Sequence, residues 1–309
     1  MIALRRQISL RERWSALQWP KIAPLRVLPL LTLVLLLVSG PEQWYLRGPL
    51  VALVALGIGL RTWLARPQFW YVVATLLGIA VYLNWESSDN HKYLFVYWCL
   101  ALCAACSLPQ GEQAPALALS SRWLIGLCMA LAVVWKAINP QYLDGTFFQY
   151  ELLCDERLAS LTTRLTGLAP AELAANRELR ELLQAGHLRG LEVSSAELTT
   201  RPAIAWLAAA MTWWTIGIEL VLAVLFLWPA GRDVAGPASV AWLRNAALVA
   251  FAATTYVVAP VRGFGWMLML LGLAQCREEE NRWRLVYLAM LVVIQAYTLP
   301  VSAIANWLF

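Results

Sequence analysis

Long runs of hydrophobic residues recur along the whole chain, separated by short polar stretches. A membrane-spanning helix needs about 20 mostly apolar residues, or somewhat fewer where flanking side chains snorkel to the interface. By this rule the pattern predicts a polytopic all-α bundle of about nine integral membrane helices, forming a single membrane domain over 1–309. The expected helices are 24–40, 48–65, 69–85, 92–108, 122–139, 203–228, 239–259, 263–276 and 284–308. For the short segment 263–276, a re-entrant hairpin is the alternative.

One loop, 140–202, is long and of mixed charge. Leu and Ala recur there at helical spacing, so it is not expected to be disordered. Pro170 suits the first turn of a helix, and Gly186 is expected to end that helix. The segment 157–168 has similar character. These patterns predict amphipathic helices that lie on the membrane surface or cap the bundle.

Composition supports a membrane protein. Of 309 residues, 61% are hydrophobic and only 14% are charged, whereas a soluble domain carries about 25% charged residues. Two His and six Cys are too few and too scattered to predict a metal site, and no disulfide is expected. The net charge of +5 gathers at predicted cytoplasmic loops, which indicates topology and not nucleic-acid binding.

The basic residues of the short loops predict the orientation. The N-terminal basic segment is followed by an apolar run with no small-x-small cleavage site, so we expect a retained first helix and not a signal peptide. We expect a cytoplasmic N-terminus, a multi-pass protein of the bacterial inner membrane, and an extracytoplasmic loop 140–202. The basic residues assigned to the inner side are the N-terminal cluster, Arg61, Arg66, Arg122, Arg232, Arg244, Arg277, Arg282 and Arg284.

Three titratable residues could carry chemistry, since an ionisable side chain within a span is costly. Lys136 lies near the outer end of its helix, where it is either a snorkelling lysine or a desolvated amine that acts as a base. Glu219 lies deep in its span and is expected to face the bundle and find a polar partner. His91, beside Asp89 and Lys92, is either an ordinary surface histidine or a member of the same site.

In the predicted topology, His91 and Lys136 lie at the same outer level, beneath the large loop. Asp144-Gly145, just after Lys136, allows a turn there. Two titratable groups under a lid outline an active site.

The same residues carry a family resemblance. Asn90-His91-Lys92-Tyr93-Leu94, then Lys136 followed by Leu143-Asp144-Gly145, then Glu219-Leu220 followed by Pro229-Ala230-Gly231-Arg232 occur in this order. In these stretches the chain resembles the HTTM (horizontally transferred transmembrane) family, bacterial relatives of the membrane part of vitamin K-dependent γ-glutamyl carboxylase. The similarity runs over roughly residues 20–280.

This resemblance implies a quinone-linked membrane enzyme. Lys136 would be the base that deprotonates a reduced quinone of the menaquinone or vitamin K type, with His91 as a second catalytic group. Asn90, Tyr93, Trp135, Asp144 and Glu219 would line the site. The substrate would be a peptide or a small molecule. Where the family usually has Phe-His in a late helix, this chain has Phe251-Ala252, which leaves open whether carboxylation is the reaction.

Two other classes of function stay open. In a non-catalytic membrane subunit, Trp-rich faces would pack against another membrane protein and lipid, and Lys136 would only snorkel. A small-molecule or peptide transporter is the third class, although the chain shows no inverted repeats or paired broken helices.

Overall fold

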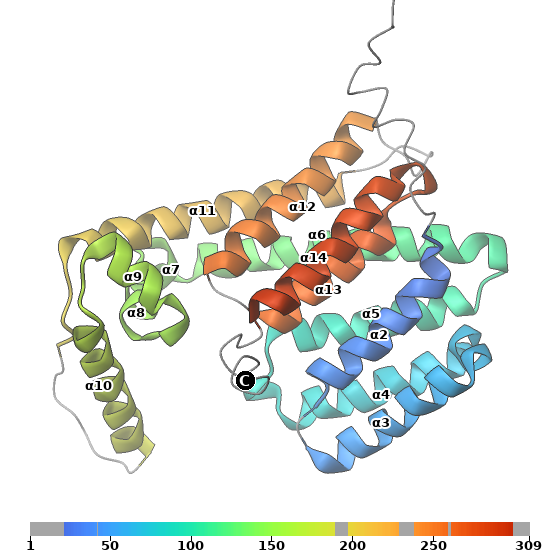
Figure 1. Ribbon diagram of the computed structural model, residues 1–309, viewed down its shortest axis with the longest axis horizontal. Coiled ribbons are helices and arrows are strands. Elements are labelled where there is room, and N and C mark those ends of the chain that lie inside the picture. The colour runs from blue at the N-terminus through green and yellow to red at the C-terminus, as the bar shows by residue number, and fades with distance from the viewer. Residues whose placement is uncertain (1–21, 42, 189–196, 229–237, 259–260, 299–309) are drawn as a thin grey trace, which may run out of the picture.

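A computed structural model describes residues 22–41, 43–188, 197–228, 238–258 and 261–298, and in these ranges the chain is helical without strands (Figure 1). The expected all-α class is therefore confirmed. Every apolar segment predicted to be a helix contains one, although the predicted helix 48–65 ends at Gly59 and is followed by the 3₁₀ turn Arg61–Ala65. The corresponding helices are α2 Pro24–Ser39, α3 Trp44–Gly59, α4 Pro67–Leu83, α5 Asn90–Cys106, α6 Gln110–Ile138, α11 Pro202–Leu227, α12 Ala238–Val258, α13 Arg262–Gln275 and α14 Asn281–Thr298.

The two longest helices, α6 and α11, pack against each other. Among the described residues, these are the two helices that are both long and apolar enough to cross a membrane. A chain with nine such spans is therefore not established by helix length. Helix α6 begins at Gln110, well before the expected position 122. Its first turn is polar, so the apolar pattern does not predict it. A polar sequence can still form a helix, so α6 extends beyond its apolar part.

Helix α13 forms the centre of the bundle and contacts α2, α5, α6, α12 and α14. A helix that is apolar on all sides needs such a position, and all residues from Trp266 to Cys276 are buried. Three glycines let neighbouring rings approach its backbone: Gly263 faces His91, Gly265 faces Tyr256 and Gly272 faces Tyr287. The segment is one continuous helix, so the re-entrant hairpin alternative is wrong.

The segment between α6 and α11 folds into α7 Pro140–Leu143, α8 Thr146–Cys154, α9 Ala159–Thr166 and α10 Pro170–Leu188. It has its own small core around Leu152, Leu153 and Leu158, which packs against Ile204 and Ala208 of α11. The helix predicted to start at Pro170 does so, but it continues past Gly186. Figure 1 shows this segment as a group of short helices beside one end of the bundle.

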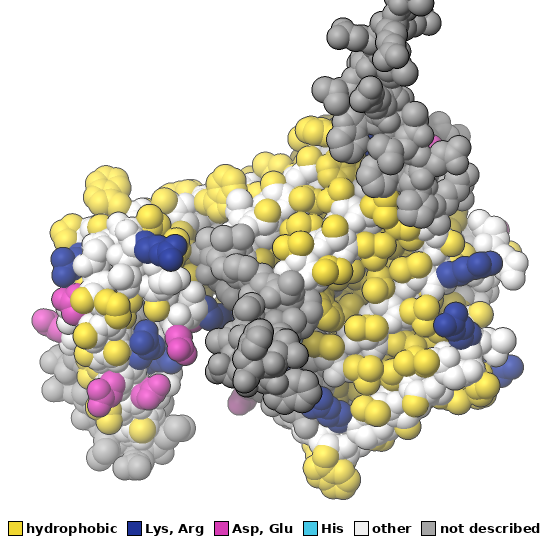
Figure 2. All heavy atoms as spheres, in the orientation of Figure 1, with side chains coloured by type: hydrophobic (Ala, Val, Ile, Leu, Met, Phe, Trp, Pro, Cys, Tyr) yellow, Lys and Arg dark blue, Asp and Glu magenta, His cyan; other side chains and the backbone are white. Residues whose placement is uncertain are grey.

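One face of the molecule carries an apolar band. Figure 2 shows hydrophobic side chains across the face formed by the bundle helices, whereas charged side chains gather over α9 and α10 and near the edges. Several exposed tryptophans lie close to helix ends, the position that tryptophan favours at membrane interfaces. These tryptophans are Trp44, Trp85, Trp135, Trp206, Trp228 and Trp242.

Candidate functional site

A buried ion pair joins α6 to α11. The Nζ of Lys136 lies 2.6 Å from Oε1 and 2.5 Å from Oε2 of Glu219. The two side chains are only 12% and 10% exposed. The pair therefore places a cation and a carboxylate, 83 residues apart in the chain, in a region largely screened from solvent.

This geometry decides between the alternative interpretations of Lys136 and Glu219. The expectation that Glu219 faces the bundle and finds a polar partner is confirmed. The snorkelling alternative for Lys136 is wrong, because its amine turns inward to Glu219. A charge in an apolar medium is stabilised only by a well-placed partner of opposite sign, and the two carboxylate oxygens provide that partner.

Aromatic rings from the following segment lie beside the pair. The amine of Lys136 is 5.7 Å from the ring centroid of Tyr142. Tyr142 stacks on Phe147 with centroids 4.2 Å apart, and Phe148 meets both rings edge-on. Burial, together with the nearby charges of Glu219 and Glu151, raises the pKa of Tyr142 to about 12. Tyr142 therefore stays a neutral phenol, able to donate its hydroxyl proton in a hydrogen bond.

A turn after α6 places these rings. The side chain of Asn139 accepts a hydrogen bond from the backbone N–H of Gln141, which starts α7. Gly145 has φ +81°, a left-handed conformation that favours glycine, and so the predicted turn is confirmed. The Asp144 carboxylate accepts the backbone N–H of Thr146 at 2.8 Å, a bond that lowers the pKa of Asp144. Asp144 is exposed and caps α8.

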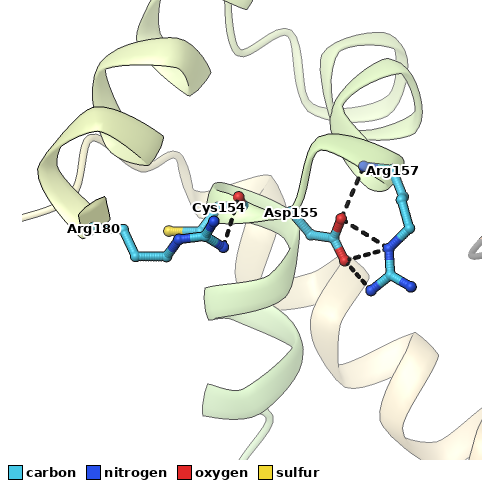
Figure 3. Close-up of polar contacts among 4 residues, drawn as sticks. All are labelled: Cys154, Asp155, Arg157 and Arg180. Atoms are coloured by element: carbon cyan, nitrogen blue, oxygen red, sulfur yellow. Dashed lines mark hydrogen bonds and ion pairs between the residues drawn. The ribbon is translucent and has the colours of Figure 1, made fainter. Parts of the chain in front are cut away.

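Further polar contacts hold the short helices together. The Asp155 carboxylate accepts bonds from the backbone N–H and the guanidinium of Arg157, and Arg180 donates to the Cys154 carbonyl at 3.3 Å (Figure 3). The hydrogen bonds that Arg157 donates to Asp155 raise the pKa of Arg157, and the charge of Asp89, before α5, adds to this effect. These contacts stabilise the segment that carries Tyr142.

His91 lies against α13. Its ring packs against the backbone of Gly263 in α13, and its Nδ1 lies 3.9 Å from Asp89 Oδ2. Lys136 lies farther from the α5–α6 connection than His91 does, by roughly 15 Å at 1.5 Å per helical residue. The described contacts do not bring His91 to the pair, and its membership of the site stays a prediction.

The other predicted residues are more exposed. Asn90 and Tyr93 lie in the first turn of α5 with exposed side chains, and Trp135 is 60% exposed on α6. A pocket of about 170 Å³ lies between the start of α5, the end of α4 and the turn that follows α2, and Lys92 and Phe95 are among its lining residues. Of the predicted site residues, the structure brings Lys136 and Glu219 together, with Asp144 on the adjoining turn.

Sequence reasoning missed Tyr142, although it follows Lys136 by six positions. The signal available was the aromatic group Tyr142, Phe147 and Phe148 directly after a charged helix end. A desolvated amine beside flat rings suits an aromatic group that bears an acidic hydroxyl.

A scan against protein-family models, a search of curated proteins and a search of solved structures each found no significant match. Within the described ranges, no cluster of three or more His, Cys, Asp or Glu side chains could hold a metal ion.

Proposed function

We propose that the chain is an integral membrane enzyme in which the Lys136–Glu219 pair removes a proton from a substrate at the extracytoplasmic face. The observation that supports this function best is the buried contact between one amine and both oxygens of one carboxylate. The resemblance to HTTM proteins and vitamin K-dependent carboxylase supports the same role for Lys136. The substrate is a peptide or a small molecule.

Proton transfer from Lys136 to Glu219 within the pair would produce a neutral amine and a neutral carboxylic acid. Lys136 must lose one proton before Nζ can accept another, and the Glu219 carboxylate is within hydrogen-bonding distance to take it. A neutral amine beside a neutral acid also avoids two buried charges. Nζ then accepts the substrate proton, and the ammonium so formed balances the negative charge left on the substrate.

When bound, a reduced quinone of the menaquinone or vitamin K type would supply two electrons, and its oxidation by an external acceptor such as dioxygen would drive proton abstraction. Lys136 and the stacked rings of Tyr142 and Phe147 are the residues that would hold it. The neutral Tyr142 hydroxyl can donate a hydrogen bond to an anionic oxygen there. Exclusion of water by α6 and α11 would protect a strongly basic centre from quenching.

The Lys136→Arg variant tests the proposal. Arginine keeps the positive charge and can pair with Glu219, but its guanidinium cannot act as a base at neutral pH. The variant should fold and should lose activity by about 10²–10⁴-fold, the usual contribution of general base catalysis. The measurement is oxidation of a reduced menaquinone analogue by the purified protein in lipid nanodiscs.

Lys92→Arg is the matched control, because Lys92 lies at the start of α5 and none of the described contacts joins it to the pair. This variant should keep its activity. Full activity of Lys136→Arg would exclude the base role. In that case the second candidate function, a non-catalytic membrane subunit, becomes the better one. It draws support from the pair's position between the two longest helices and from the exposed Trp206, Trp213 and Trp214 on α11.

The proposed site requires that the segment 140–202 lies outside the cytoplasm of a bacterial inner membrane, with a cytoplasmic N-terminus and nine spans. A cysteine introduced at Gly186 should react with a membrane-impermeant maleimide in intact cells, above the background of the unmodified chain. Labelling only after the membranes are opened would reverse the orientation and move the site to the cytoplasm.

A further inference from the structure

Three arginines are buried far from the Lys136–Glu219 pair. Arg122 on α6, Arg244 on α12 and Arg284 on α14 are 6%, 4% and 5% exposed. Arg122 precedes Lys136 by 14 positions on the same helix, or roughly 20 Å at 1.5 Å per residue. The three arginines therefore belong to the opposite end of the bundle.

Two of these arginines bind backbone carbonyl groups. Arg284 donates to the carbonyls of Ile22 and Cys276 at 2.9 and 2.8 Å. Arg122 donates at 3.2 Å to the carbonyl of Trp228, at the carboxyl end of α11, where the helix dipole favours a cation. Both side chains thus fasten helix ends to one another.

Arg244 is held in a different way. Its Nε donates to Gln275 Oε1 at 2.9 Å, and its guanidinium carbon lies 5.7 Å from the ring centroid of Phe226. Gln275 in turn donates to Asn245, which also accepts a bond from Tyr287. Among the described residues, the two Nη nitrogens of Arg244 have no hydrogen-bond partner. The network orients this guanidinium and leaves its two Nη nitrogens able to donate hydrogen bonds to a ligand.

Charged side chains surround Arg244. Among the described residues, Arg122 and Arg277 are its basic electrostatic neighbours and Glu280 is the acidic one. The Glu280 carboxylate accepts the backbone N–H of Arg277 and the amide of Asn245. No ion pair joins Glu280 to an arginine within the described part of the chain. Arg244 likewise has no ion pair among the described residues, so its guanidinium can bind an anion.

We propose that Arg244, with Arg122 beside it, forms a binding site for a phosphate group, either of an anionic lipid headgroup or of a free phosphate ion. The planar guanidinium donates two parallel hydrogen bonds that match phosphate oxygens. Burial strengthens this interaction because the effective dielectric constant is lower than in water. A site at the end of an apolar bundle also lies at the depth of lipid phosphates.

The experiment measures the thermal unfolding midpoint of the full-length protein in a neutral detergent. Short-chain phosphatidate, inorganic phosphate and phosphatidylcholine are titrated separately. A phosphate site predicts a saturable rise of the midpoint, since a ligand that binds only the folded state stabilises it. A rise with phosphatidate alone identifies a lipid, whereas a rise with inorganic phosphate as well identifies a free anion.

Arg244→Gln should weaken the apparent affinity at least about tenfold, the scale of a lost charge-assisted hydrogen bond. Glutamine retains an amide that can donate to Gln275. Arg122→Gln should act in the same direction and serves if the first variant does not fold. The exposed Arg61→Gln, in the 3₁₀ turn after α3, is the matched control and should bind as the parent does. The proposal is overturned if neither phosphate source shifts the midpoint, or if the shift survives both Arg244→Gln and Arg122→Gln.

Discussion

The two ends of the bundle bury charge by different means. At one end, the Lys136 ammonium and the Glu219 carboxylate compensate each other directly. At the other end, the described hydrogen bonds of Arg122, Arg244 and Arg284 go to backbone carbonyls and to the side chain of Gln275. A buried charge needs a partner in both cases. Among the described residues, Lys136 has a carboxylate within hydrogen-bonding distance, whereas Arg244 has the neutral side chain of Gln275.

This difference has a chemical consequence. A lysine can give its proton to an adjacent carboxylate, so the Lys136–Glu219 pair can exchange a charged form for a neutral one. Arginine stays protonated in any protein environment, so Arg244 keeps its positive charge and cannot lose it by proton transfer to a neighbour. The lysine end is therefore suited to proton transfer, and the arginine end to holding an anion.

The largest expected effect concerns the stability of the ion pair. Lys136→Met removes the cation and leaves Glu219 buried without its partner, which should lower the free energy of unfolding by about 3–5 kcal/mol. The double variant Lys136→Met/Glu219→Met should recover most of this loss, because two apolar side chains replace two charges. Unfolding in mixed micelles with increasing SDS measures both values.

Activity of the double variant separates stability from catalysis. A stable but inactive double variant supports the base role. Single and double variants of equal stability would show that the pair is too well hydrated to behave as a buried one, and the contrast between the two ends would then disappear.

The helices were predictable because apolar length is a local property. Each hydrophobic run predicted its helix, and the cost of a carboxylate inside a span correctly predicted a polar partner for Glu219. The identity of that partner was not predictable, because Lys136 is 83 residues away and periodicity does not indicate which helices pack together. Helix position alone allowed Lys136 to point toward water.

The arginines show the same limitation more clearly. Arg122, Arg244 and Arg284 were interpreted as loop charges that set the membrane orientation, yet all three are buried. A basic residue near a helix end has the same sequence pattern whether it faces water or a polar network. The partners of Arg244 and Arg284, Gln275 and the carbonyls of Ile22 and Cys276, lie on other elements of the fold.

A smaller effect is expected within the arginine end. Asn245 Oδ1 accepts from Gln275 at 2.5 Å and from the Tyr287 hydroxyl at 2.7 Å. Asn245→Leu leaves both donors unsatisfied and should cost about 2–4 kcal/mol, whereas Tyr287→Phe removes one donor cleanly and should cost about 1 kcal/mol. The same SDS titration compares the two variants. Equal losses would mean that Asn245 does not organise the network that orients Arg244.

The smallest effect tests whether His91 belongs to the lysine end. A Cβ on Gly263 would lie 2.6 Å from His91 Nε2, whereas one on Gly217 in α11 would meet no atom within 4 Å. Gly263→Ala should therefore displace the His91 ring, at a net cost of about 1 kcal/mol. Gly217→Ala should stabilise the protein by about 0.5–1 kcal/mol, since alanine favours a helix.

Adding His91→Ala to Gly263→Ala should remove the clash and restore stability, as the same unfolding titration would show. The rates of quinol oxidation by Gly263→Ala and Gly217→Ala then show whether His91 contributes to activity. If His91 takes part in proton transfer, Gly263→Ala loses activity while Gly217→Ala keeps it, even though Gly217 is only two residues from Glu219. If Gly263→Ala is fully active, His91 acts only as a packing residue on α13, and Lys136 and Glu219 carry the proton chemistry without it.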